Sequence, residues 1–199
     1  MSKLYIAITF LFLSNLIALG QNKEERVLLK TDTTWIKEIF NLPTGFAQEM
    51  TVSGFEEAVF PPGWSKVESP QLWSYIFAWS VVAEQPMELQ SIENNLEIYF
   101  DGLMGVPKDT IVGPKLPTTA LLIETTIPKG IESFAGKVRT FDRFRSNEMM
   151  TLHILVTQHF CEKQQKAIVV FRFSPKEFTH EVWELLNSVP LRKDACEIP

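Results

Sequence analysis

The chain has 199 residues, of which 45% are hydrophobic and 22% are charged, and its net charge is −5. This length supports one domain with a sizeable core, and the composition is ordinary for a globular protein. Because binding to nucleic acid requires a basic surface, the acidic balance argues against that class of partner.

The first twenty residues have the features of a secretory signal peptide. Lys3 gives the segment a positive start, residues 4–13 form an apolar run, and residues 18–20 form a small-x-small cleavage motif. An uncleaved membrane anchor is the alternative, but Ser14 and Asn15 interrupt the apolar run that a spanning helix needs. We therefore predict cleavage between Gly20 and Gln21 and export to the periplasm or out of the cell, with no transmembrane segment in the mature chain.

Residues 21–199 form one predicted domain, which begins with short apolar segments. Residues 35–40 fit either a helix or a strand, and the sequence alone does not separate the two. Residues 50–60 are expected to be extended, with a break at Gly54, before two prolines and a glycine at 61–63 turn the chain.

The next segment is a predicted strand with one large aromatic face. Trp73, Tyr75, Phe77 and Trp79 alternate with smaller residues, which is the period of two that a strand requires. We expect these rings to anchor the core. The alternative is an exposed aromatic platform that stacks on sugars or contacts an apolar partner, and Trp64 in the preceding loop is the ring we expect to be most exposed.

The C-terminal half contains two predicted helices and four predicted strands. A helix near 87–104 is expected to end at Gly102 or Gly105, and a second helix is expected near 176–189. Short links separate strands at 120–127, 134–145, 149–160 and 167–173, so neighbouring strands should be antiparallel. We predict an α+β fold, in which helices pack on one face of an antiparallel β-sheet of about five to seven strands.

Two resemblances bear on this prediction. From residue 87 to 190, the order of elements resembles the PsbP/Mog1-like α/β/α sandwich. The block from Gly54-Phe55 through Phe60-Pro61-Pro62-Gly63-Trp64 to Trp73-Ser74-Tyr75 is similar to exported bacterial proteins of unassigned function. Neither resemblance implies catalytic residues. Proteins of the PsbP/Mog1-like type are mostly binding or accessory factors, so that resemblance implies a protein that is not an enzyme.

A basic stripe is the most informative polar feature of the sequence. On the predicted strand 134–145, alternate positions carry four cations, interrupted only by Phe141, and the same face continues onto the next two strands. The predicted ligand-binding residues are Lys137, Arg139, Phe141, Arg143, Arg145, His153, His159 and Arg172, together with Trp64. Such a stripe suits a phosphate, a carboxylated sugar or a lipid headgroup. The alternative is a solvated sheet face that neighbouring acids balance.

Carboxylates and histidines suggest weaker hypotheses. Glu56, Glu57, Glu124 and Asp142 are candidates for the acid pair of a glycoside hydrolase. His180 and Glu184 resemble part of a zinc-protease motif that lacks its second histidine. We therefore predict no catalytic residues, no metal and no cofactor.

The two cysteines, Cys161 and Cys196, are predicted to form a disulfide. After Cys161, the strand at 167–173 runs away for about 23 Å at ~3.3 Å per residue. The helix at 176–189 returns about 21 Å at ~1.5 Å per residue, which brings the tail back within reach. Two free thiols are the alternative. An oxidising compartment would permit the bond.

Taken together, these patterns predict an exported, non-catalytic binding or accessory protein. Its partner would be a small anionic ligand, a glycan or another protein, contacted through the basic strand face. The alternative is an extracellular or periplasmic hydrolase that uses carboxylates from its loops.

Overall fold

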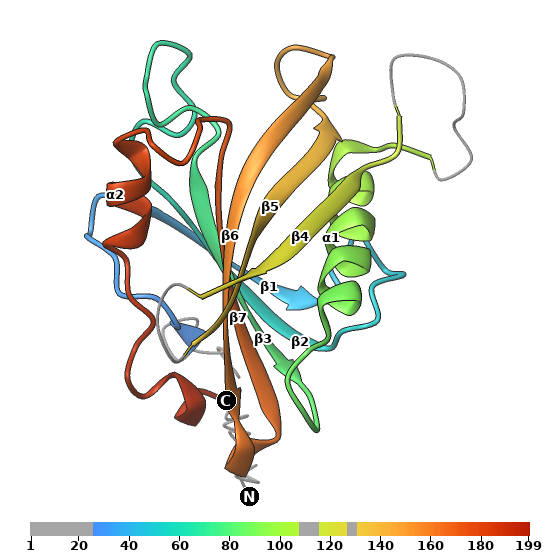
Figure 1. Ribbon diagram of the computed structural model, residues 1–199, viewed down its shortest axis with the longest axis vertical. Coiled ribbons are helices and arrows are strands. Elements are labelled where there is room, and N and C mark those ends of the chain that lie inside the picture. Colours follow the sequence, from blue (N-terminus) through green and yellow to red (C-terminus); the bar gives the residue numbers. More distant parts are fainter. Residues whose placement is uncertain (1–25, 108–115, 127–130) are drawn as a thin grey trace, which may run out of the picture.

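The computed structural model describes residues 26–107, 116–126 and 131–199, so the predicted signal peptide lies outside the described residues (Figure 1). In these residues, seven strands form one sheet, and every pair of neighbouring strands is antiparallel. The strands are β1 (Ile36–Leu42), β2 (Gly54–Phe60), β3 (Tyr75–Val82), β4 (Thr119–Thr125), β5 (Glu132–Phe141), β6 (Met149–Cys161) and β7 (Lys166–Ser174). The helices are α1 (Leu89–Met104) and α2 (Val182–Asn187), with short 3-10 turns η2 (Glu162–Gln164) and η3 (Ala195–Glu197). This arrangement confirms the predicted fold class and strand number.

The sheet consists of two meanders joined along one seam. Its strand order is β1-β2-β3-β7-β6-β5-β4. Strands β1 to β3 follow one another in space as they do in sequence, and so do β4 to β7. The seam between the two meanders is the β3–β7 pair, in which Phe77 lies opposite Phe171.

Each face of the sheet carries its own hydrophobic core. On β3, Phe77 and Trp79 pack with α1, whereas Ile76 and Ala78 pack with α2 on the other face. Figure 1 shows the two helices on opposite sides of the sheet. The expectation that both helices lie on one face was therefore wrong. The reason is that the central strands are apolar on both faces, so both faces must be covered.

Helix α1 ends at a left-handed glycine, as one of the two sequence alternatives predicted. Gly105 has a φ of 61°, and its N–H donates to the carbonyl oxygens of Asp101 and Gly102. Gly102 lies inside the helix for a packing reason. A Cβ atom there would lie 2.1 Å from the carbonyl oxygen of Phe46, so only glycine lets the turn near residue 46 rest on α1.

For one segment the structure decides between two predicted alternatives, and two elements are shorter than predicted. Residues 36–42 form strand β1, which decides between helix and strand for this segment. Helix α2 is shorter than the predicted 176–189, because turns occupy the residues before it. Strand β5 ends at Phe141 rather than at Arg145, because the carboxylate of Asp142 accepts hydrogen bonds from backbone N–H groups and closes a turn.

The predicted disulfide is present. Cys161 and Cys196 are bonded, with their Cα atoms 5.6 Å apart, inside the normal range for such a bond. It anchors the tail beside β6, and a backbone hydrogen bond from Arg192 to Leu28 ties the same tail to the N-terminal segment. Among the described residues, no helix is both long enough and apolar enough to cross a membrane.

Candidate functional site

A cavity of about 310 Å³ lies on the α1 face of the sheet, between β1–β3, α1 and the two loops at 61–74 and 142–147. We call it the aromatic pocket, because nine of its lining side chains are aromatic: Phe40, Phe46, Phe60, Trp64, Trp73, Tyr75, Phe77, Tyr99 and Phe144. The other lining residues are Glu38, Ala58, Leu103 and Arg145. A concave, mostly apolar cavity with few polar groups is the usual form of a small-molecule site.

The loop between β2 and β3 places two tryptophans in the pocket wall. The backbone N–H of Trp73 donates to the carbonyl oxygen of Trp64 over 2.9 Å, which joins the two ends of the loop. Trp73 has a φ of 55°, a left-handed conformation that is unusual for an aromatic residue and costs on the order of 1–3 kcal/mol. The Phe60 ring lies 4.6 Å from the Trp64 ring, so the loop is held against the sheet by ring packing. A strained residue held in this way is common beside a ligand site.

Two charged side chains of opposite sign lie at the edge of the pocket. Glu38 and Arg145 are both exposed, and Arg145 donates from its guanidinium to the carbonyl oxygen of Ser65. The neighbouring Arg143 lies with its guanidinium carbon 5.7 Å from the Phe144 ring centroid. The pocket therefore has an apolar interior and a charged rim.

A buried carboxylate lies beneath the pocket. Glu56 is 0% exposed and accepts hydrogen bonds from Trp79 Nε1 at 2.8 Å and from Tyr99 Oη at 2.9 Å. Burial raises the pKa of Glu56 to about 7; the two hydrogen bonds oppose that shift, and the nearby charge of Glu38 adds to it. Burial likewise raises the pKa of the Tyr99 hydroxyl, so it remains a donor to Glu56. Both donors are neutral, and within the described part of the chain no cation pairs with this carboxylate.

The residues of the predicted basic stripe divide between the two faces. Trp64 and Arg145 line the aromatic pocket, and Arg143 lies beside it. Phe141 is buried in the α1-side core. The break occurs at Phe141, the last residue of β5, just before the turn at Asp142.

The remaining stripe residues lie on the α2 face. Lys137 and Arg139 are exposed on β5, and Arg172 is buried on β7. His153 is 4% exposed, and its Nε2 lies 3.2 Å from Oε2 of Glu177 without the geometry of a hydrogen bond. His159 is exposed near the end of β6.

The candidate carboxylates of a hydrolase serve the fold. Glu56 and Glu57 are adjacent on β2, so their side chains point to opposite faces. Glu57 accepts a hydrogen bond from the backbone of Leu29 at 2.8 Å and pairs with Lys37 at 3.1 Å. Asp142 holds the turn after β5, and Glu124 is exposed on β4.

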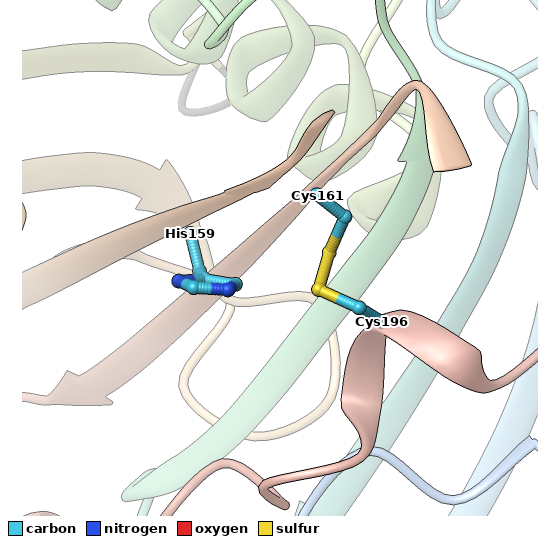
Figure 2. A group of neighbouring side chains, drawn as sticks. All are labelled: His159, Cys161 and Cys196. Carbon is cyan, nitrogen blue, oxygen red and sulfur yellow. A yellow bond between two sulfur atoms is a disulfide. The ribbon is translucent and has the colours of Figure 1, made fainter. Parts of the chain in front are cut away.

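Among the described residues, one group of three potential metal ligands lies together. The ligand atoms of His159, Cys161 and Cys196 are within 4.8 Å of one another. Figure 2 shows the three side chains side by side. The two sulfur atoms are bonded to each other, and metals bind the thiolate form of cysteine. The disulfide therefore anchors the tail, and its sulfur atoms are not thiolates that could bind a metal.

Sequence reasoning missed most of the pocket. It named Trp64 and Arg145, and it named Trp73, Tyr75 and Phe77 as core rings or an aromatic platform. It did not name Glu38, Phe46 or Phe144, which come from three separate segments. One signal for the pocket was available in the sequence. The chain has 15 phenylalanines, many more than the predicted aromatic strand contains.

Comparison with protein-family models, with curated proteins and with solved structures found no match to this chain. The resemblance of residues 87–190 to PsbP/Mog1-like proteins therefore stays a prediction. The functional argument rests on the geometry of the chain itself.

Proposed function

We propose that this chain is an exported, non-catalytic binding protein whose aromatic pocket holds one small, largely apolar ligand. The observation that carries the proposal is the pocket of about 310 Å³ with its nine aromatic side chains. This volume is at the lower end of the range for ligand pockets, roughly 300–1,000 Å³. It suits a ligand with one to three rings or a short acyl chain.

The chemistry of the pocket defines where the apolar and polar parts of the ligand lie. Flat ring faces contribute affinity by burying apolar area, at about 25 cal/mol per Å². Glu38 and Arg145 lie at the solvent-exposed rim, where ion pairs contribute little affinity. The ligand's apolar part therefore fills the interior, and its polar end faces the rim.

Two further observations support a binding role in an exported protein. Glu56, Glu57 and Asp142 already accept hydrogen bonds that hold the fold, which favours binding over hydrolysis by these acids. The Cys161–Cys196 disulfide and the signal-peptide pattern both suit an oxidising compartment.

The test is a titration of the exported protein with N-phenyl-1-naphthylamine, a neutral probe that fluoresces in apolar surroundings. We expect saturable binding at one site. Trp64→Ala removes a wall of the pocket and should weaken the affinity at least tenfold. Leu103→Trp should do the same by filling the space, because Leu103 is half-buried and lines the pocket.

Trp35→Ala is the matched control. Trp35 is also half-buried but packs with the core on the α2 face, so its loss should leave probe affinity unchanged. Equal affinities for the wild type, Trp64→Ala and Leu103→Trp, with all three folded by circular dichroism, would refute the proposal.

A further inference from the structure

A second cavity, of about 470 Å³, lies on the α2 face of the sheet. We call it the Arg172 cleft. Its lining includes Arg172 from β7, Thr157 from β6, and Phe178, Trp183 and Asn187 from the C-terminal segment. It is distinct from the aromatic pocket, because the two cavities share no lining residue.

Arg172 is buried, with 8% of the residue exposed. Its Nε donates to the carbonyl oxygen of Leu186 and its Nη2 to that of Val189, both over 3.1 Å. These two bonds use one edge of the planar group. Among the residues that the structure describes, Nη1 has no hydrogen-bond partner, so the edge formed by Nη1 and Nη2 is available to the cleft.

No carboxylate of the described residues lies within ion-pair distance of Arg172. Burial lowers the pKa of Arg172 to about 10, so the group still carries its charge at neutral pH. Buried charges in proteins are normally paired, because removing an ion from water is costly. On the same face, the buried carboxylate of Glu57 has Lys37 as its partner, whereas Arg172 has only carbonyl dipoles.

The walls of the cleft are apolar and aromatic beside this cation. The ring centroids of Phe178 and Trp183 are 4.9 Å apart, and Phe178 is 41% exposed at the opening. Thr157 and Asn187 supply hydroxyl and amide donors. Lys137 and Arg139 lie exposed on the same face of β5, where their charge attracts anions.

We propose that the Arg172 cleft binds a small organic carboxylate. The two carboxylate oxygens accept hydrogen bonds from the open guanidinium edge, which matches them in geometry. The apolar part of the ligand packs against Phe178 and Trp183. A monocarboxylate fits better than a phosphate dianion, since one buried cation balances one negative charge. This site is independent of the ligand proposed for the aromatic pocket.

The test uses benzoate as the probe and benzamide as its neutral analogue of the same shape. Heteronuclear NMR titration of the exported protein should show saturable shifts for Trp183 and the Asn187 amide with benzoate. Benzamide should bind at least tenfold more weakly, and benzoate affinity should fall as the sodium chloride concentration rises.

Two variants that replace asparagine with aspartate make the test sharp. Asn187→Asp places a carboxylate in the cleft, where it competes for the guanidinium, so benzoate affinity should fall at least tenfold. Asn94→Asp makes the same charge change at an exposed site on α1 and should leave the affinity unchanged. Arg172→Met should also abolish binding. It removes the hydrogen bonds to Leu186 in α2 and to Val189 beyond it, so its fold must be checked, and Asn187→Asp decides the question without it.

Trp64→Ala separates the two sites. If benzoate occupies the cleft, Trp64→Ala leaves its affinity intact, whereas loss of benzoate binding in that variant would assign the probe to the aromatic pocket and overturn the proposal. Equal binding of benzamide, or full benzoate affinity in Asn187→Asp, would also overturn it.

Discussion

A buried glutamate lies on each face of the sheet, and the two glutamates have different kinds of partner. Glu56 and Glu57 are neighbours on β2, both 0% exposed, and they point to opposite faces. On the α2 face, Glu57 has a lysine and backbone N–H groups as partners. On the α1 face, the partners of Glu56 among residues 26–107, 116–126 and 131–199 are the neutral donors Trp79 and Tyr99, and burial raises its pKa to about 7.

This difference shows how each face suits its own kind of ligand. The aromatic pocket on the α1 face has an apolar lining with Glu38 and Arg145 at its rim, which favours an apolar ligand. The α2 face holds buried or exposed cations along β5 and β7, and one of them, Arg172, lacks an ionic partner among the described residues. The predictions below test this contrast, in order of decreasing effect on stability.

Trp79→Ala should have the largest effect. The side chain is 0% exposed in the aromatic core, and its removal also deprives the buried Glu56 of a donor. We expect a loss of about 3–5 kcal/mol in the free energy of unfolding, measured by urea denaturation at pH 7. A loss below about 1 kcal/mol would mean that the core relaxes around the gap and that the α1 face is far less rigid than its packing indicates.

Removal of the disulfide tests the α2 face. The bond spans 35 residues, so the chain-entropy model gives a loss of roughly 3–4 kcal/mol for the double variant Cys161→Ala/Cys196→Ala. We expect binding of N-phenyl-1-naphthylamine in the aromatic pocket to be unchanged, because the tail packs on the opposite face. Two reactive thiols in the unfolded, unreduced protein would show that the bond is not formed.

The pKa of Glu56 predicts a pH dependence of stability. In the unfolded chain the carboxyl has its ordinary pKa of 4.5, whereas burial in the folded protein raises the pKa to about 7. The unfolded state therefore loses its proton first, so this group's contribution to stability falls as pH rises from about 4.5 to 7. Between pH 5 and pH 8, the wild type should lose roughly 2–3 kcal/mol through this group.

Glu56→Gln should remove that part of the pH dependence. The amide oxygen can still accept from Trp79, and the amide nitrogen can donate to Tyr99. The measurement is urea denaturation at both pH values for the wild type, Glu56→Gln and the matched control Glu124→Gln, which changes an exposed acid. The prediction fails if Glu56→Gln and Glu124→Gln show the same profile.

Trp64→Ala should have the smallest effect on stability. Trp64 is half-buried in a loop, so we expect a loss below about 1 kcal/mol in the free energy of unfolding. The same variant should still lose pocket affinity. A large loss of stability would show that Trp64 holds the loop rather than serving the ligand.

Local patterns predicted much of the fold. The period of two in β3, the helical spacing that ends at Gly105 and the short links between strands each act over neighbouring residues, and each was confirmed. The face on which each helix packs was not predictable in this way. The packing face of each helix depends on which strands become central in the sheet and need cover on both faces. That is a property of the assembled sheet.

The candidate sites were less predictable for the same physical reason. The alternation of strand residues predicted that Arg139 and Arg145 share one face. In the structure, the Asp142 carboxylate accepts hydrogen bonds from backbone N–H groups and closes a turn between these two arginines. The aromatic pocket joins Phe46, Tyr99 and Phe144, which are distant in sequence. By contrast, the disulfide was predicted correctly although the length argument overstated the helix: α2 covers only Val182–Asn187, and turns before and after it make up the rest of the return path.

The seam between β3 and β7 has a consequence for how the chain folds. Within each meander, the paired strands are neighbours in sequence, so they can pair by closing short loops at a small cost in entropy. The β3–β7 ladder alone joins the last strand to the first meander, and it must close across α1 and three strands. We expect this closure to limit the folding rate. Because both cores meet at these two strands, their amide hydrogens should exchange only when the whole molecule opens.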